Sequence, residues 1–123
     1  MENLREWHKE RMMERTVKAL LSNYFDAHFF TDRTSLLESI MYHVYPGMTI
    51  GIGGSLSIRG IGLLENLAQI DVEVLDHWKQ GLTKEDIDVI RLAQLTCDLF
   101  LSSANAITEK GDIVNIDGSG NRV

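Results

Sequence analysis

The residues best suited to chemistry lie in a glycine-rich turn near the middle of the chain, Gly53-Gly54-Ser55. This turn follows a β-branched run that ends at Ile52 and precedes apolar residues at helical spacing, so we expect a strand, a turn and a helix. A helix that starts here would direct free N–H groups and its positive dipole end toward an anion. The spacing matches neither a dinucleotide-binding fingerprint nor a P-loop. Two interpretations stay open: an anion-binding turn, or a tight turn whose glycines serve only close packing.

A second concentration of polar side chains lies in the C-terminal tail, which alternates neutral hydrogen-bonding residues with glycine. Such a pattern lets donors and acceptors approach a small polar ligand closely, and it favours binding over a pair of ordinary turns. The candidate binding residues of the tail are Asn105, Asn115, Asp117, Gly118, Gly120, Asn121 and Arg122. Arg122 is the cation of this set and could hold a phosphate or carboxylate bidentately.

Two carboxylates of the tail, Glu109 and Asp117, are the candidates for acid–base work. Glu109 stands beside Lys110-Gly111 in an expected β-turn, where a solvated charge fits better than a catalytic one. Asp117 could bond N–H groups of its loop, bind a ligand hydroxyl or pair with Arg122. The residues alone leave open whether the protein is an enzyme.

Metal-ligand spacing is lacking, because the four histidines stand far apart and the single cysteine, Cys97, forms no CxxC pair. An iron–sulfur cluster needs several cysteines, so this chain is expected to hold neither a metal nor a cofactor. We expect Cys97 to be a reduced thiol in the core. His77 is followed by Trp78 at the end of an expected strand and could stack on or bond a ligand; the alternative is a satisfied surface histidine.

Strands and helices alternate through the middle of the chain, which predicts a Rossmann-like α/β fold with a mostly parallel sheet and helices on both faces. The expected helices span residues 2–23, 35–44, 57–67 and a segment that begins at Thr83, and the expected strands span 26–30, 49–52, 72–75 and 98–102. The helix after Thr83 should bury Ile87, Ile90, Ala93, Leu95 and Cys97. Residues 109–112 read as a β-turn that joins two short strands.

Because the carboxyl ends of parallel strands meet at one edge of a sheet, ligands bind there. Three segments should lie at that edge: 53–55, 76–78 and 102–105.

Composition indicates a single globular domain, with 123 residues of which 44% are hydrophobic and 24% charged. The net charge of −6 opposes a phosphate backbone, so nucleic acid is not an expected partner. No signal peptide or membrane-length apolar run occurs, so we expect a cytoplasmic protein without a membrane partner.

Three stretches, 51–55, 97–108 and 111–122, resemble the LUD-domain family, a lactate-utilisation group of small bacterial proteins. The resemblance runs from about Arg15 to the C-terminus. It implies the fold shared by ribose-5-phosphate isomerase, glucosamine-6-phosphate deaminase and the CoA transferases, and it adds Thr108 to the candidate site. Some members act with iron–sulfur subunits in lactate oxidation, which implies iron–sulfur only through a partner subunit. CoA transferases of this fold use a glutamate nucleophile, which makes Glu109 a conceivable counterpart.

A second likeness joins residues 104–107, 111–112 and 115 to methylthioribose-1-phosphate isomerases and initiation-factor-2B-like proteins. Those proteins carry an aspartate where Asn105 stands and a lysine where Ile116 stands. Because an amide cannot move a proton, Asn105 cannot do the work of that aspartate in an isomerase, although a sugar phosphate could still be held.

The resemblance also implies a chain truncated relative to its family, with a sheet incomplete at the C-terminus. The unpaired sheet edge would favour a homo-oligomer. The function expected is that of a small-anion-binding protein, accessory to lactate or related organic-acid oxidation. The alternative is an isomerase or transferase acting on a phosphorylated or CoA-linked small substrate.

Overall fold

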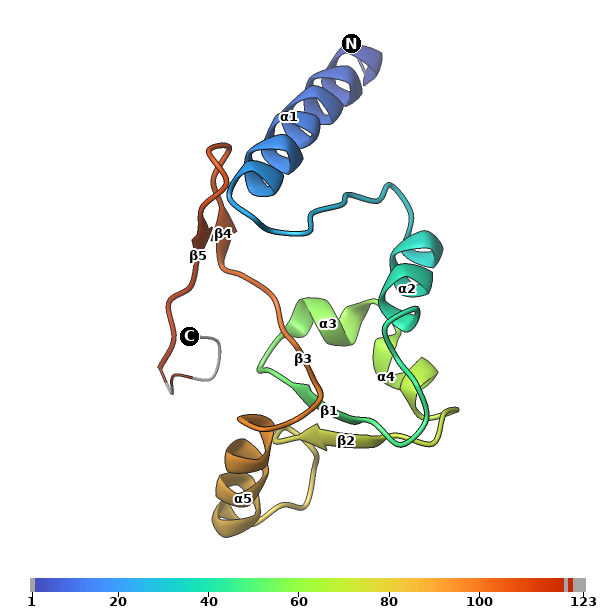
Figure 1. Ribbon diagram of the computed structural model, residues 1–123, viewed down its shortest axis with the longest axis vertical. Helices are drawn as coiled ribbons and strands as arrows, with labels where there is room; N and C mark the ends of the chain where they lie inside the picture. Colours follow the sequence, from blue (N-terminus) through green and yellow to red (C-terminus); the bar gives the residue numbers. More distant parts are fainter. Residues whose placement is uncertain (1, 119, 121–123) are drawn as a thin grey trace. The chain divides into compact units, whose positions relative to one another are not determined.

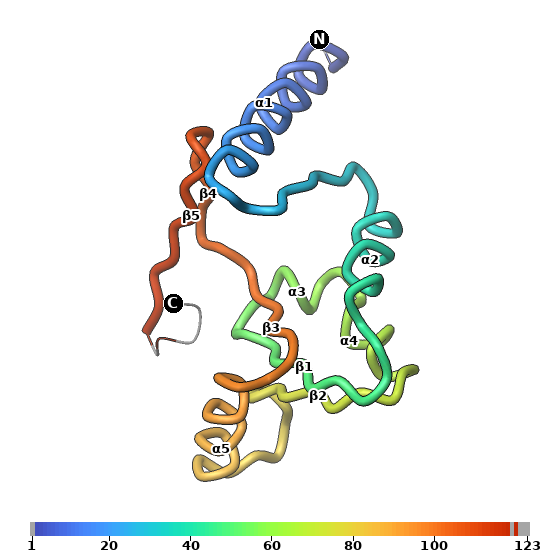
Figure 2. Tube along the Cα trace, in the orientation of Figure 1, coloured from blue at the N-terminus to red at the C-terminus, as the bar shows by residue number. Residues whose placement is uncertain are grey.

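The computed structural model describes residues 2–118 and 120, and these residues form two compact units. The first unit contains the chain up to Thr31 together with Ala104–Ile116, and the second contains Asp32–Ser103 together with the residues from Asp117 onward. Figure 2 traces the chain through both. We describe each unit by itself.

The second unit is built on a parallel sheet of three strands in the order β2-β1-β3 (Figure 1). The central strand β1 (Thr49–Ile52) pairs with β2 (Glu73–Asp76) on one side and β3 (Leu99–Leu101) on the other. The helices of this unit are α2 (Arg33–Met41), α3 (Leu56–Gly60), α4 (Leu63–Leu67) and α5 (Lys84–Gln94). The α/β fold expected from the sequence is therefore confirmed.

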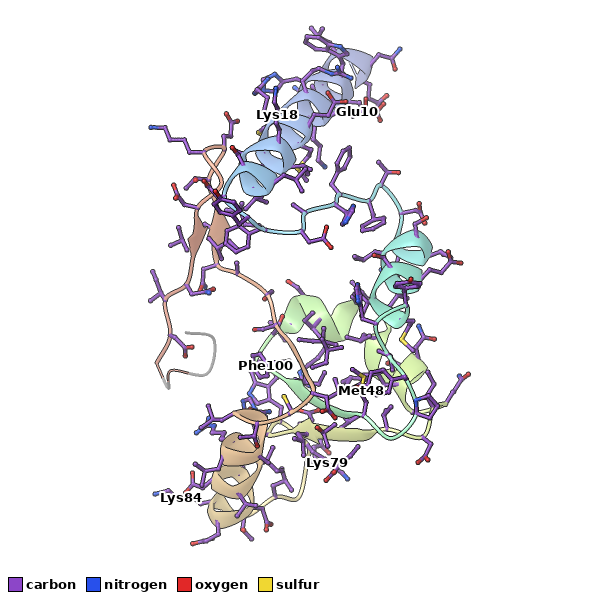
Figure 3. All side chains as sticks on the ribbon, viewed as in Figure 1. Glu10, Lys18, Met48, Lys79, Lys84 and Phe100 are labelled. Atoms are coloured by element: carbon purple, nitrogen blue, oxygen red, sulfur yellow. The ribbon has the colours of Figure 1, made fainter. Side chains whose placement is uncertain are left out.

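Helices pack against both faces of this sheet, and the central strand β1 presents a different surface to each: isoleucine side chains on one face and a glycine on the other. Ile50 and Ile52 are fully buried in a core shared with Met48, labelled in Figure 3, and with residues of α3 and α4. Gly51 faces the opposite side, toward α5. A Cβ at Gly51 would lie 2.8 Å from Cδ2 of Phe100 and 3.0 Å from Sγ of Cys97, so α5 and β3 pack directly onto the backbone of β1. The core therefore needs glycine at this position.

The helix expected over residues 57–67 is instead two short helices, and the prediction was wrong at the break. The chain leaves α3 at Ile61, and Gly62 then takes a positive φ of 83°, which side-chain-bearing residues rarely adopt. The other strands and helices of this unit lie within a few residues of their expected bounds, and Asp32 is the N-cap of α2, accepting a hydrogen bond from the Ser35 N–H.

The face that α5 buries also differs from expectation. Leu95 is 78% exposed, whereas the polar side chain of Gln94 is only 6% exposed. Leu95 is the C-cap of the helix and still has helical dihedrals, but it lies one residue beyond Gln94, so its side chain is rotated about 100° away from the face that Gln94 buries. Cys97 is half-buried, and its thiol donates to the carbonyl oxygen of Gln94 at 3.1 Å.

A capping box begins α5 at Thr83, where the sequence predicts that a helix begins. The Thr83 hydroxyl accepts from the Asp86 N–H at 3.1 Å, and the Asp86 carboxylate accepts from the Thr83 N–H at 3.0 Å. These backbone bonds lower the pKa of Asp86. We expect Thr83→Ala to lower the free energy of unfolding by about 1 kcal/mol in urea titrations followed by circular dichroism. Thr96→Ala, at an exposed hydroxyl whose bond is 3.5 Å long, is the control and should leave it nearly unchanged; equal losses would contradict the capping role.

The first unit joins helix α1 (Glu2–Ser22) to a β-hairpin of β4 (Ala106–Ile107) and β5 (Ile113–Val114). The turn expected at residues 109–112 is confirmed, with Gly111 at a φ of +85°. It contacts the end of α1: the Asn23 side-chain amide donates to the carbonyl oxygens of Lys110 and Gly111 at 3.1 and 2.9 Å. The hairpin and α1 therefore hold one another in place.

The strand expected over residues 26–30 does not form. A strand needs a hydrogen-bonded neighbour, and none of the described strands pairs with this segment. Phe29 and Phe30 instead line a groove beside Met13 of α1. Within residues 2–118 and 120, no helix combines the length and the apolar composition that crossing a membrane requires.

Candidate functional site

The best candidate site is the edge of the sheet at which its parallel strands end. We define the carboxyl edge as the residues that follow the three strands and the side chains that contact them: Gly53, Gly54, Ser55, Arg59, Asp76, His77, Trp78, Gln94, Ser102 and Ser103. Because β1 is parallel to both neighbours, these segments emerge together. The sequence predicted this meeting for 53–55, 76–78 and the start of 102–105, and the contacts below confirm it within the second unit.

Two serine hydroxyls meet between the ends of β1 and β3. The Oγ atoms of Ser55 and Ser103 are 2.7 Å apart, and either can donate to the other. Ser55 is 1% exposed and also caps α3, accepting from the Ile58 N–H at 3.1 Å. The hydroxyl of Ser55 is therefore fixed in orientation, while that of Ser103 is held by a single partner.

The glycines before Ser55 are each explained by a close neighbour. A Cβ at Gly53 would lie 2.6 Å from Oγ of Ser102, and one at Gly54 would lie 3.0 Å from the indole ring of Trp78. Close packing thus accounts for glycine at both positions, which was the second of the two interpretations left open by the sequence. The two glycines also bring the loops after β2 and β3 against the loop after β1.

A buried ion pair ties α3 to the end of β2. The guanidinium of Arg59 donates two hydrogen bonds to the carboxylate of Asp76, at 2.6 and 2.8 Å. The two side chains are only 20% and 14% exposed, and the guanidinium carbon also lies 4.6 Å from the centre of the Trp78 ring. This pairing lowers the pKa of the Asp76 carboxyl and raises the pKa of Arg59, so both groups stay charged at neutral pH.

A buried histidine follows that aspartate directly. His77 is 4% exposed, and its Nδ1 lies 3.1 Å from the side-chain nitrogen of Gln94. The same nitrogen donates to the carbonyl oxygens of Ile52 and Leu75, at 3.0 and 2.8 Å, so Gln94 joins α5 to both β1 and β2. Burial and then the charge of Arg91 lower the pKa of His77. His77 is therefore not a surface histidine, which was the alternative to ligand binding considered from the sequence.

The candidate residues of the tail mostly serve the hairpin itself. The Asn105 side chain accepts from the Ile116 N–H at 2.9 Å, and the Thr108 hydroxyl accepts from the Asp112 N–H at 3.0 Å and donates to its carboxylate. In contrast, Oδ1 of Asn115 is buried and has no hydrogen-bond partner among the described residues. The hairpin thus places Asn105 and Asn115 at its open end, whereas Thr108 lies at its turn.

Of the remaining tail candidates, Glu109 and Asp117 make local or solvent-exposed contacts. Oε1 of Glu109 lies 3.8 Å from Nη2 of Arg15 of α1, and the Glu109 side chain is 55% exposed. Glu109 is thus a solvated charge in a turn, as the sequence predicted. Asp117 accepts from the Gly120 N–H at 3.1 Å, one of the roles considered for it, and Gly118 is exposed in the same loop. Asn121 and Arg122 lie outside the described residues.

Among the side chains that the structure describes, no group of three or more histidine, cysteine, aspartate or glutamate residues lies close enough together to hold a metal ion. Cys97, the single thiol, contacts two backbone carbonyl oxygens.

Two grooves lie away from the carboxyl edge. One, of about 440 Å³, lies between α2 and α4 and is lined by Glu38 among mostly neutral residues. The other, of about 520 Å³, lies between α1 and residues 29–31 and carries Glu6, Lys9 and Glu10. Their acidic side chains disfavour a small anion in either groove.

Sequence reasoning missed Arg59 and Gln94 as members of this site, and it placed Ser103 at the edge within 102–105 without naming it as a binding residue. A signal existed for Gln94 alone: it falls four residues after Ile90 on the apolar face of its helix, where a polar residue needs a buried partner. Arg59 and Ser103 carry no such signal, because their partners Asp76 and Ser55 are distant in the sequence.

Comparisons with known proteins give one match. A family model described as the LUD domain matches residues 13–123. This range covers most of the chain and includes the carboxyl edge and the hairpin. Searches of curated proteins and of solved structures find no match.

Proposed function

Because this chain belongs to the LUD-domain family, we propose that it binds a small organic anion at the carboxyl edge, as an accessory component of lactate or related organic-acid oxidation. Family membership alone does not identify the ligand. The proposal rests on what the carboxyl edge offers chemically.

The pair of hydroxyls on Ser55 and Ser103 is the observation that carries this proposal. The pair lies between the ends of β1 and β3. From β1 the chain passes through α3 and α4, on one face of the sheet, to reach β2; from β2 it passes through α5, on the opposite face, to reach β3. In open parallel sheets, ligands bind outside the carboxyl ends of the strands at such a point. Hydroxyls can donate to a carboxylate and accept from a ligand hydroxyl, which are the two groups of a hydroxy acid.

The charges near this pair favour an anion. The charged groups that act on His77 are Arg59 and Asp76 of the carboxyl edge and Arg91 of α5, so around His77 the cations outnumber the carboxylate by one. Arg59 follows Ser55 by one helical turn of α3. A monovalent carboxylate would balance the excess positive charge.

Thermal unfolding of the full chain tests the proposal. We expect L-lactate, D-lactate, glycolate or pyruvate to raise the unfolding midpoint, by an amount that grows as RT ln(1 + [L]/Kd). Ser103→Ala should weaken that binding about fivefold, because one hydrogen bond is worth about 1 kcal/mol. Ser57→Ala, at an exposed serine of α3, is the matched control. If no carboxylate shifts the midpoint, or if both variants bind equally well, the carboxyl edge is not the site.

The accessory role adds a partner to this proposal. Any iron–sulfur centre would come from a partner subunit, because one cysteine cannot ligate a cluster. Co-purification of the tagged chain with cysteine-rich iron–sulfur subunits would support the role, and a complex without such subunits would count against it. A homo-oligomer remains part of the proposal, and sedimentation over a wide range of concentrations tests it.

The alternative function, an isomerase or transferase for phosphorylated or CoA-linked substrates, has less support. Its candidate carboxylates are Glu109, which is exposed beside Arg15, and Asp117, which bonds the N–H of its own loop. Turnover that is lost in Glu109→Gln or Asp117→Asn would favour it.

A further inference from the structure

The side-chain amide of Gln94 can take only one orientation. Its nitrogen lies 3.0 Å from the carbonyl oxygen of Ile52 and 2.8 Å from that of Leu75. If the amide were flipped, its oxygen would face two carbonyl oxygens, and three acceptors would meet without a hydrogen. The two strands therefore fix the NH₂ group as the part of Gln94 that faces His77.

This orientation determines where the imidazole proton of His77 lies. Nδ1 of His77 is 3.1 Å from the same NH₂ group, which can donate hydrogen bonds and cannot accept one. Its two hydrogens are shared among three acceptors, the two carbonyl oxygens and Nδ1, so the bond to Nδ1 is a shared one. A hydrogen on Nδ1 would instead point at this NH₂ group and find no acceptor there. Nδ1 must therefore present its lone pair, and the proton of the neutral ring lies on Nε2. A doubly protonated ring would set an N–H against an NH₂ group.

The surroundings of His77 reinforce this state. The ring is 4% exposed, and two cations, Arg91 of α5 and Arg59 of α3, disfavour a second proton, while Asp76 of β2 favours it. Burial is the largest influence, and the net effect lowers the pKa of His77. Nε2 makes no hydrogen bond to a described residue, yet it is not one of the fully buried unpaired atoms of the described chain, which are Nε of Arg59, Nε of Arg91 and Oδ1 of Asn115. Nε2 is therefore accessible from solvent and can meet an acceptor there.

We propose that His77 donates its Nε2–H to an oxygen of the bound anion at the carboxyl edge, with Gln94 as the positioning residue that fixes the tautomer. The inference rests on the proposed function and deepens it: the ligand must carry an acceptor for a neutral donor, such as a carboxylate or a 2-oxo oxygen. His77 recognises that oxygen without adding charge.

Nitrogen NMR of the imidazole rings tests the first step without any substitution. In the wild-type chain, long-range proton–nitrogen correlation should show His77 with its proton on Nε2 at neutral pH, and addition of L-lactate should shift the Nε2 resonance more than the Nδ1 resonance. A proton on Nδ1, a charged ring at neutral pH, or no response of Nε2 to a carboxylate that binds would overturn the inference.

Three variants test the role of the donor itself. His77→Phe should weaken L-lactate binding about tenfold, since it removes the hydrogen bond. His77→Gln should retain most of the binding, because the amide nitrogen of glutamine can stand in for Nε2. His43→Phe, at an exposed histidine of the same unit, is the control and should bind normally. If the wild type binds L-lactate and His77→Phe binds it equally well, this inference fails while the proposed function stands. If the wild type binds none of the carboxylates, both fail.

The positioning role of Gln94 has its own readout. Gln94→Met keeps the length of the side chain and removes the NH₂ group, so the NMR spectrum should show a mixture of both neutral tautomers of His77. Gln69→Met, at an exposed glutamine, should leave the tautomer unchanged. An unchanged tautomer in Gln94→Met would show that Gln94 does not set it.

The pH dependence of stability gives an independent check. The pKa of His77 is lowered from its ordinary value of 6.5 when the chain folds. At pH values between the lowered pKa and 6.5, the unfolded chain therefore binds more protons than the folded chain. The stabilisation is therefore complete above about pH 6.5 and decreases as the pH falls through the lowered pKa. Urea titrations of the wild type and of His77→Gln should diverge in this range. Parallel pH profiles would contradict a neutral, buried His77.

Discussion

Asp76→Asn will lower the free energy of unfolding by about 3 kcal/mol. Asparagine keeps the shape of the side chain and can still accept from the Trp78 N–H, a bond of 2.9 Å in the wild type. It removes the negative charge, so the guanidinium of Arg59, 20% exposed, is left without its counter-charge. The loss is large because a partly buried charge has little water to replace the lost carboxylate. Urea denaturation, followed by circular dichroism, measures it.

A surface pair is the control for this result. Arg11 and Glu14 of α1 are 2.9 Å apart, but their side chains are 45% and 48% exposed. Glu14→Gln should therefore cost less than about 0.5 kcal/mol. The double variant Arg59→Met with Asp76→Leu should recover much of the stability lost in Asp76→Asn, because it removes both charges together. A cost for Asp76→Asn no larger than that for Glu14→Gln would show that the pair is effectively solvated.

Acid should remove the stability that the ion pair between Arg59 and Asp76 contributes. The pKa of Asp76 is lowered by Arg59, so the unfolded chain takes up a proton at a higher pH than the folded chain does. The contribution of Asp76 is complete above its ordinary pKa of 3.8 and is lost as the pH falls through the lowered value. Asp76→Asn should remove this part of the acid profile. The same variant gains net positive charge at the carboxyl edge and should bind carboxylates more tightly if the proposed site is correct.

Gly111→Ala will destabilise the first unit by about 3 kcal/mol, for two reasons that add. The residue has a φ of +85°, which costs an alanine about 1 to 2 kcal/mol. Its Cβ would also lie 2.7 Å from the carbonyl carbon of Ala19 and 2.8 Å from the oxygen of the same residue. Both contacts are with backbone of α1, so no side-chain rotation relieves them. We expect the hairpin to lose its contact with α1.

Gly81 is the matched control for the backbone strain alone. It has a φ of +84°, and no heavy atom lies within 4 Å of the position of a Cβ. Gly81→Ala should therefore show only the cost of the dihedral, about 1 kcal/mol. Urea titrations give the two costs, and amide exchange across α1 should accelerate in Gly111→Ala alone. Equal costs in the two variants would mean that the turn does not contact α1 as described.

Features that depend on neighbours in the sequence were predictable from the sequence alone. Thr83 and Asp86 form their capping box, and Ser55 caps α3, because a cap joins residues three positions apart in any helix. The run Thr49–Ile52 forms a strand, and residues 109–112 form a turn, from local preferences of the same kind. The three stretches that resemble the LUD domain likewise led to the correct family.

Tertiary structure decided which of these residues form a site. The amide of Gln94 contacts carbonyl oxygens 42 and 19 positions away, Arg59 pairs with an aspartate 17 positions away, and Ser55 meets a serine 48 positions away. No spacing rule identifies such partners, because the sheet order and the parallel register bring them together. The same holds for Gly51, Gly53 and Gly54, whose lack of a side chain matters only once Phe100, Ser102 and Trp78 lie against them. Local chemistry in the sequence therefore determined the elements and the family, and the pairing of β1 with β2 and β3 determined the site.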